Sequence, residues 1–318
     1  MSLEFGNQID RGEGTRKPVP VAVEPGRCPD WLGLAIREAG GQLTELEQAE
    51  ALVWLGGEPN ALRRLLTEHP QIQWVQLQAA GTDDFTSVFD TKRIWTSAKG
   101  AYSRAIAEHA LALALAIARG LPEDVVATSW IPRERASLFQ SQVLLVGGGG
   151  VAQALAELLR PFEPRLIAVR RTSAPMPGAD ETLQSSELHR AIPEADLIFL
   201  TLALTEDTVG VISQREFALM RDSAILVNVA RGKHIVTDDL VDALDADVLF
   251  GAGLDVTDPE PLPAGHRLWH MHNCIITSHS ANPSYALRHS LGQRVRENVR
   301  RFSHNAPLIG VIDVTAGY

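Results

Sequence analysis

The chain has 318 residues, of which 45% are hydrophobic and 21% are charged, and this composition is typical of globular proteins rather than of disordered ones. At roughly 150 residues per domain, the length predicts about two domains. A formal net charge of −10 repels phosphate backbones and anionic lipids, so we expect no nucleic-acid and no membrane partner. Cys28 and Cys274 lie in no metal-ligand spacing, and residues 1–18 lack the apolar core of a signal peptide. These features predict a cytoplasmic protein.

Short β-rich segments alternate with helical segments along nearly the whole chain, which is typical of parallel βαβ units. The strands fall into two series. The first comprises residues 19–23, 51–55, 74–78 and 93–96, and the second comprises residues 142–146, 165–169, 196–200, 224–228, 248–256 and 274–277. The strands are apolar on both faces, as in a sheet that helices cover on each side. The sequence therefore predicts the α/β class, with two doubly wound parallel-sheet domains of the Rossmann or flavodoxin-like type.

Helical patterns separate and follow these strands. We expect helices that begin at Asp30 and that cover residues 61–69, 103–118 and 284–303. The apolar helix at 103–118 is shorter than the roughly 20 residues that a bilayer demands, so we expect it to be buried, with Ser103 as its cap and Gly120 at its end. The last helix follows the final strand and can return to pack on the first domain. The predicted domains are residues 1–100 with 285–318, and residues 101–284.

A glycine turn directly follows the first strand of the second series and precedes a helical segment, ALAELLR, at 154–160. This context makes a G-x-G-x-x-G/A dinucleotide fingerprint credible. Gly147 permits the tight turn, Gly149 lets the backbone approach a pyrophosphate, and Ala152 allows close packing of helix on strand. The helix N-terminus adds free N–H groups for the phosphates. The candidate cofactor residues are Gly147, Gly149, Gly150, Val151 and Ala152, and the alternative is a glycine-rich turn without a ligand.

The end of the second strand in this series distinguishes the two nicotinamide cofactors. An acidic residue there would hold the ribose 2′-hydroxyl of NAD. This strand ends instead in Arg170, Arg171 and Thr172. Guanidinium groups match phosphate oxygens, whereas a carboxylate would repel them, so the sequence predicts that NADP (NADPH) is preferred over NAD. A solvated basic turn is the alternative reading of the same residues.

Three further segments place polar residues directly after apolar strands, where open α/β sheets bind their ligands. They carry Arg231 in NVARG, Glu260 in GLDVTDPEP and His279 in TSHS. An arginine, a carboxylate and a histidine at successive strand ends form a plausible acid–base site. Taken singly, each has a structural explanation: a surface ion pair, a loop charge beside prolines and a hydrogen-bonded loop histidine.

From about residue 51 to residue 318 the sequence resembles the D-isomer-specific 2-hydroxyacid dehydrogenases, through the glycine fingerprint, NVARG, GLDVTDPEPLP and SHSAN in this order. The resemblance implies that Arg231 binds the substrate carboxylate and keto oxygen, that His279 donates the proton and that Glu260 is its partner. It also implies that Asp255 faces the nicotinamide and that backbone N–H groups of Ala80 and Gly81 bind the carboxylate. Ala203 and Val229 complete the candidate cofactor contacts.

The chemistry of reducing a 2-keto acid agrees with these roles. The reaction needs a hydride on carbon and a proton on oxygen, and a carboxylate such as Glu260 favours the charged form of an adjacent histidine. Paired hydrogen bonds from Arg231 would fix the carboxylate while polarising the carbonyl. Residues 101–284 would then bind the dinucleotide, and residues 1–100 with 285–318 would bind the substrate.

The sequence departs from the family pattern at three positions that carry no reacting group. Ser278 precedes His279 where the family often has proline, Ala203 also stands where proline is frequent, and Ser97 replaces a common asparagine. ALVW (51–54), ARGKHIVTDDL (230–240) and the last residues look most like the glyoxylate/hydroxypyruvate reductase branch, which prefers NADPH. This predicts an NAD(P)-dependent reductase of a small 2-keto acid that produces the D-2-hydroxy acid.

Three alternatives stay open at this point. The chain could reduce a larger 2-keto acid, or it could be a non-catalytic NAD(P)H-sensing binding protein on the same fold. The third alternative is a metalloenzyme that uses His266, His270 and His272, although no carboxylate or cysteine completes a ligand set, so we expect no metal.

The helix at 103–118 is apolar on nearly every face, and the family's dimers use the corresponding helix, so we expect a homodimer. Burial of this helix between the two domains of one chain is the alternative.

Overall fold

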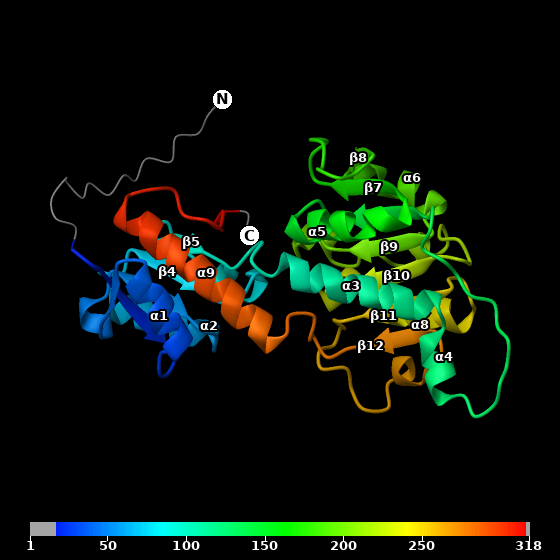
Figure 1. Ribbon diagram of the computed structural model, residues 1–318, viewed down its shortest axis with the longest axis horizontal. Helices are drawn as coiled ribbons and strands as arrows, with labels where there is room; N and C mark the ends of the chain where they lie inside the picture. The colour runs from blue at the N-terminus through cyan, green and yellow to red at the C-terminus, as the bar shows by residue number, and fades with distance from the viewer. Residues whose placement is uncertain (1–16, 316–318) are drawn as a thin grey trace. The chain divides into compact units, whose positions relative to one another are not determined.

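A computed structural model describes residues 17–315, and the chain divides into two compact units. The first unit comprises Met1–Ala101 and Ser284–Tyr318, and the second comprises Tyr102–Pro283. Expectations for residues 1–16 lie outside the described residues. Both units are parallel α/β sheets covered by helices, which confirms the predicted fold class (Figure 1).

The first unit contains a five-stranded parallel sheet in the order β2-β1-β3-β4-β5, the flavodoxin-like order. Its strands are β1 Val19–Glu24, β2 Gly41–Leu43, β3 Ala51–Trp54, β4 Trp74–Leu77 and β5 Ile94–Thr96. Its helices are α1 Asp30–Glu38, α2 Pro59–Glu68 and α9 Ser284–Ser303, with 3₁₀ turns at Leu46–Gln48 and Asp83–Val88. Helix α9 packs beside α1 (Figure 1), so the C-terminal segment does return to the first series of strands.

Buried polar bonds tie α9 to this sheet. The Asn298 side-chain amide donates to Gln76 Oε1 at 2.9 Å, and Thr96 Oγ1 donates to the same oxygen at 2.9 Å. The rings of Trp74 and Phe302 lie 5.3 Å apart. Because these buried groups satisfy one another, the helix keeps a fixed register on the strands.

The second unit contains a seven-stranded parallel sheet in the order β12-β11-β10-β9-β6-β7-β8. Its strands are β6 Gln142–Val146, β7 Arg165–Arg170, β8 Glu181–Gln184, β9 Leu197–Leu200, β10 Ile225–Asn228, β11 Gly251–Leu254 and β12 Cys274–Ile276. Its helices are α3 Ser103–Ala118, α4 Leu121–Val126, α5 Gly150–Leu159, α6 Leu188–Ala191, α7 Gln214–Phe217 and α8 Thr237–Asp245, with 3₁₀ turns at Arg160–Phe162, Ser185–Glu187, Ile192–Glu194, Glu206–Thr208, Gly232–His234 and Arg267–His270. The strand order reverses between β6 and β9, where a Rossmann sheet binds its ligand at the carboxyl ends of the strands.

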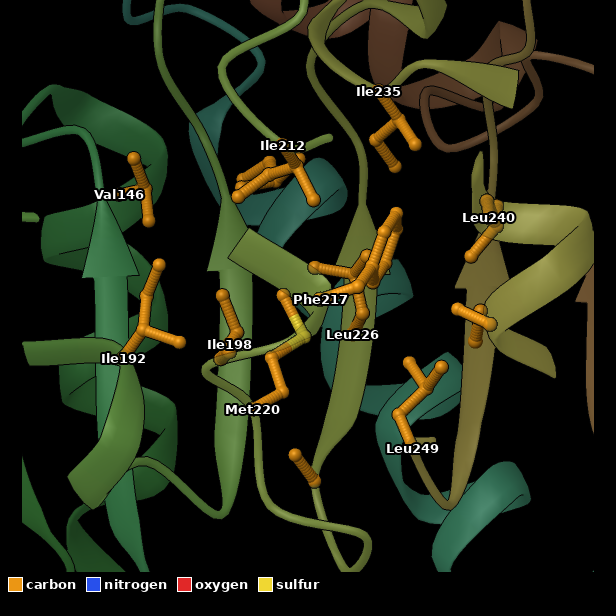
Figure 2. Close-up of a cluster of buried hydrophobic side chains, with 14 of the residues drawn as sticks. Val146, Ile192, Ile198, Ile212, Phe217, Met220, Leu226, Ile235, Leu240 and Leu249 are labelled. Atoms are coloured by element: carbon orange, nitrogen blue, oxygen red, sulfur yellow. The ribbon is translucent and has the colours of Figure 1, made fainter. Parts of the chain in front are cut away.

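Alternate residues of the central strands of this sheet enter two different cores. Leu144 and Val146 of β6 pack with residues of α6, α7 and α8. Figure 2 shows part of this cluster, with Val146, Phe217 and Leu240 among the labelled side chains. Val143 and Leu145 of the same strand pack instead against α3 and α5 on the other face. Both faces are therefore buried, which explains why these strands are continuously apolar.

The predicted elements differ from the observed ones mainly at edges and ends. The edge strands β2 and β8 were not predicted, because GQL and ETLQ are polar and lack the apolar run of an inner strand. Strand β11 is shorter than the predicted 248–256. Ser103 is the first residue of α3 rather than its cap, and Tyr102 takes the cap position without a side-chain hydrogen bond.

Helix α3 buries six of its residues, and its packing partners lie in its own unit. Its apolar residues pack on α5, β10 and β11, and among residues 103–118 only Arg104, Glu108 and Ala112 are exposed. The sheet and α5 account for the buried face of this helix, and the expectation of a homodimer stays a prediction.

Candidate active site

The glycine turn after β6 requires glycine at its first position. Gly147 has φ 120°, and a Cβ there would lie 2.7 Å from Thr201 Oγ1 and 2.8 Å from the Thr201 carbonyl carbon. Thr201 directly follows β9, which is the neighbour of β6 in the sheet. The turn is thus tight because two strand ends meet at the point where the strand order reverses.

The next part of the turn has the shape that a dinucleotide needs. A Cβ on Gly149 would meet no atom within 4 Å, and Gly149 and Gly150 are both exposed at the start of α5. Ala152, one turn further on, is fully buried against the sheet. Open backbone at a helix N-terminus accepts a pyrophosphate, so the residues from Gly147 through Val151 to Ala152 fit this group.

Arg170 at the end of β7 lies across this turn. A Cβ on Gly148 would fall 2.8 Å from Arg170 Cδ and 3.0 Å from its Nε, so the absence of a side chain at 148 makes room for the arginine stem. The guanidinium donates to Ala174 O at 3.4 Å. Arg171 and Thr172 follow in the exposed turn after the strand. The three residues lie at the end of β7 and in the turn after it, and their contact with a ribose stays a prediction.

The segment after β10 presents Arg231. Buried Asn228 shapes it: its side-chain amide donates to Arg231 O at 2.9 Å, and its Oδ1 accepts from Ala230 N at 3.0 Å. Gly232 then packs against the loop that follows β11, because a Cβ at this position would lie 1.9 Å from Thr257 O. The Arg231 segment and the loop that carries Glu260 are thus in backbone contact.

His279 and Glu260 form a hydrogen-bonded pair. Nδ1 of His279 lies 2.7 Å from Glu260 Oε1, and both side chains are about half exposed. The backbone of His279 has φ 49°, which is unusual for a residue with a side chain. Since Nδ1 is engaged, Nε2 is the ring nitrogen left to meet a substrate, and it has no partner within residues 17–315. Strained backbone at such a position is common at functional sites.

Asp255 holds the loop that carries His279. Its carboxylate is 2% exposed and accepts hydrogen bonds from Thr277 Oγ1 at 2.5 Å, Ser280 N at 2.9 Å and Ala281 N at 3.1 Å. Burial alone would raise the pKa of this carboxyl, but the hydrogen bonds from His109, Thr277, Ser280 and Ala281 outweigh burial and lower it. In this structure Asp255, which follows β11, therefore contacts the loop after β12, and its expected place beside a nicotinamide stays a prediction.

His109 and Thr277 belong to the same site and were not predicted to do so. Nε2 of His109, on α3, lies 2.9 Å from Thr277 Oγ1 and 3.4 Å from Asp255 Oδ1. A signal was present in the sequence, because Glu108 and His109 interrupt an apolar helix that is otherwise committed to the core.

The other predicted site residues are placed as follows. Val229 lies half-buried after β10, and Ala203 lies exposed after β9, where its carbonyl accepts from Thr208 Oγ1 at 2.9 Å. Ala80 and Gly81 belong to the first unit, in the loop after β4. Their substrate and cofactor roles stay predictions.

The histidine-rich segment does not gather metal ligands. His266 Nδ1 accepts from Leu268 N at 3.3 Å, and His270 ends a 3₁₀ turn rather than lying in a strand. In the part of the chain from residue 17 to residue 315, no group of three or more histidine, cysteine or acidic side chains is placed to bind a metal ion. Within the same range, no helix is both long and apolar enough to cross a bilayer.

Comparison with known proteins identifies the family to which this chain is similar. Residues 111–281 match the family model described as D-isomer specific 2-hydroxyacid dehydrogenase, NAD binding domain. An uncharacterized protein of Corynebacterium melassecola is 36% identical over 89% of this chain and 95% of its own length. The glyoxylate reductase/hydroxypyruvate reductase of Mus musculus is 34% identical over 63% of this chain, which spans 64% of that protein.

A solved structure extends this likeness to nearly the whole chain. The NADPH-dependent glyoxylate/hydroxypyruvate reductase of Sinorhizobium meliloti, determined with NADP and sulfate, has a TM-score of 0.80 and 25% identity. The match covers 94% of this chain and 99% of the Sinorhizobium meliloti chain. The resemblance seen in the sequence motifs is confirmed.

Proposed function

The chain belongs to the D-isomer-specific 2-hydroxyacid dehydrogenases, which makes it an NAD(P)-dependent oxidoreductase, and from this premise we propose that it reduces a small 2-keto acid of the glyoxylate or hydroxypyruvate kind to the D-2-hydroxy acid. The hydrogen bond between His279 and Glu260 carries the proposal. A proton donor held by a carboxylate is what a keto oxygen needs when it becomes a hydroxyl. The printed names of the mouse and Sinorhizobium relatives support the choice of substrate.

Arg231 would anchor the substrate. Its guanidinium can give paired hydrogen bonds to the carboxylate of a 2-keto acid and polarise the adjacent carbonyl. The buried Asn228 fixes the backbone on which this side chain stands, through its bond to Arg231 O. A fixed anchor holds the keto carbon in one orientation, which lowers the entropic part of the barrier.

His279 would give the proton to the keto oxygen from Nε2. Glu260 would accept from Nδ1–H, which sets the orientation of the ring and leaves Nε2 facing the keto oxygen. The half-exposed position of both side chains lets the imidazole regain a proton from solvent after each turnover. Each of the two residues thus has one role, and neither role requires a metal.

The residues around the glycine turn would hold the dinucleotide, which when bound supplies the hydride. The pyrophosphate would lie at the N-terminus of α5 over Gly149, and Arg170, Arg171 and Thr172 would bind a ribose 2′-phosphate. We propose NADPH as the preferred cofactor on this charge pattern, because no carboxylate follows β7 in residues 170–174. The second unit would then be the cofactor domain, with Ala203 and Val229 at the strand ends beside it.

The first unit would bind the substrate. The backbone N–H groups of Ala80 and Gly81, in the loop that follows the carboxyl end of β4, are the donors we assign to the substrate carboxylate. Backbone donors at strand ends are a common way for a sheet to hold an anion. The free thiols of Cys28 and Cys274 support a reducing compartment, and a cytoplasmic location stays a proposal.

A substrate screen tests the proposal. NADPH oxidation by the purified chain would be followed with glyoxylate, hydroxypyruvate, pyruvate, phenylpyruvate and a branched 2-keto acid. We expect the highest kcat/KM with one of the first two and D-configured product. If only the larger 2-keto acids were turned over, the proposed substrate class would be wrong and a larger 2-keto acid would be the substrate. Tight NADPH binding with no turnover of any of them would identify an NAD(P)H-sensing protein instead.

A further inference from the structure

His109 makes the polar contact between α3 and the loop that presents His279. It stands in the middle of a helix whose other inward residues are apolar, and its side chain is about a quarter exposed. Its Nε2 lies 2.9 Å from Thr277 Oγ1, which in turn lies 2.5 Å from Asp255 Oδ1. Nε2 also lies 3.4 Å from Asp255 Oδ1, so the three polar groups form one cluster that joins α3 to the end of β11.

The number of available protons determines which group is the donor in each of these hydrogen bonds. The hydrogen bonds to Asp255 lower its pKa, so its carboxylate is ionised near neutral pH and can only accept. Thr277 has one hydroxyl proton, which it must then donate to Asp255. The contact between Thr277 and His109 requires Nε2–H of the ring as the donor, and the histidine is thereby held with a proton on Nε2.

Asp255 is bonded on both sides of His279. Its carboxylate accepts from Ser280 N and Ala281 N, which follow His279, and its backbone carbonyl accepts from His279 N at 2.8 Å. Thr277, two residues before His279, completes the set through its side chain. The left-handed backbone of His279 is thus fixed by bonds from three neighbours and from its own N–H that all reach one buried residue, Asp255.

We propose that His109 and Thr277 are positioning residues for the proton donor: through Asp255 they hold the loop so that His279 keeps its bond to Glu260 and its Nε2 toward the keto acid. The proposal rests on the proposed function, since it gives His279 the proton transfer. A loop that loses one of these bonds can shift by a fraction of an ångström, and a displacement of about 1 Å can lower a rate roughly 10²-fold.

Two pairs of variants separate positioning from packing. Thr277→Val removes the hydroxyl at nearly constant volume, whereas Thr277→Ser keeps it. His109→Leu removes the donor, whereas His109→Gln places an amide N–H near the position of Nε2. We expect kcat for the keto acid to fall about 10- to 100-fold in the valine and leucine variants, with KM and NADPH affinity close to wild type, and to recover in the serine and glutamine variants.

A matched histidine elsewhere in the second unit serves as the control. His189 Nε2 lies 2.6 Å from Glu216 Oε1, a largely buried carboxylate, and neither residue contacts His109, Thr277 or Asp255 in the hydrogen bonds given above. His189→Leu should lower the melting temperature and leave kcat unchanged. If His189→Leu lowered kcat as much as His109→Leu, the loss would reflect general destabilisation and the positioning role would be refuted.

NMR measures the protonated nitrogen of His109 without any activity assay. It therefore tests the positioning role independently of the catalytic role of His279. In protein labelled with ¹⁵N-histidine, the signals that His109→Gln removes should show a proton on Nε2, and a proton on Nδ1 alone would overturn the proposal. Full activity of Thr277→Val, while His279→Ala is inactive, would also overturn it and leave the catalytic role of His279 intact. An active His279→Ala would instead contradict the proposed function itself.

Discussion

The carbonyl of Thr257 occupies the space that a side chain at Gly232 would need: a Cβ on Gly232 would lie 1.9 Å from Thr257 O. The contact joins the segment after β10, which carries Arg231, to the loop after β11, which carries Glu260. Glycine at 232 is therefore required by close backbone approach. This contact, together with the bond from Asp255 N to Asn228 O at 2.9 Å, holds the two segments next to each other.

Gly232→Ala should force the two loops apart. We expect a loss of about 1–3 kcal/mol in the free energy of unfolding, the usual cost of overpacking, together with a fall in kcat/KM for the keto acid. Gly292→Ala in α9 is the control, because a Cβ there would meet the Trp31 ring at an ordinary 3.5 Å and alanine favours a helix. Equal stability of the two alanine variants in urea unfolding would contradict the close contact.

His279→Ala should lower kcat by roughly 10²- to 10⁴-fold, the usual contribution of a positioned general acid, with little effect on NADPH binding.

Arg231→Ala should instead lower kcat/KM strongly, since it loses substrate binding and carbonyl polarisation together. Steady-state kinetics with the best keto acid and fluorescence titration with NADPH measure these effects. Wild-type turnover by His279→Ala would place the proton donor elsewhere.

The sequence predicted these residues because each directly follows an apolar strand, and parallel strands bring their carboxyl ends to one edge of a sheet. It did not predict the cluster of His109, Thr277 and Asp255, because His109 reaches the site from α3, far away in the chain. Side-chain contacts between a helix and a loop have no periodicity that a sequence could show. The edge strands β2 and β8 escaped prediction for a related reason, since only pairing with a neighbour makes their polar residues a strand.

Cofactor preference should depend on Arg170. We expect a higher kcat/KM with NADPH than with NADH, and a reversed order in Arg170→Asp, because the carboxylate would accept from a free ribose 2′-hydroxyl and repel a 2′-phosphate. Gly148→Ala should also reduce the preference for NADPH, because its Cβ would displace the Arg170 stem. Equal kcat/KM for both cofactors in the unmodified protein would contradict this prediction.

A double-mutant cycle checks that the effect of residue 148 acts through Arg170. In an Arg170→Ala background the stem is absent, so Gly148→Ala should leave the ratio of NADPH to NADH efficiency unchanged. If Gly148→Ala lowered the ratio equally in both backgrounds, it would act on the glycine turn itself and not on the arginine.

The ionised state of Asp255 should be visible in the pH dependence of stability. Burial raises and hydrogen bonds lower its pKa, with a net lowering, so the folded state binds a proton here less readily than the unfolded chain does. The stabilisation is therefore fully present above the unfolded-state pKa of about 4 and is lost as the pH falls through the lower folded-state value. The difference in unfolding free energy between wild type and Asp255→Asn should shrink below about pH 4, and a difference independent of pH would contradict the prediction.

We expect the protein to form a homodimer through residues 121–139. Val125, Val126, Trp130, Ile131 and Phe139 are all more than half exposed, and Trp130 is 97% exposed. Large apolar side chains gathered on one exposed segment indicate an interaction surface. Sedimentation velocity at micromolar concentration should show a dimer, and Trp130→Asp combined with Val126→Asp should produce the monomer without unfolding it, because both side chains already lie in solvent. A single species near the chain mass of 34.6 kDa in the unmodified protein, unchanged by NADPH, would refute the dimer.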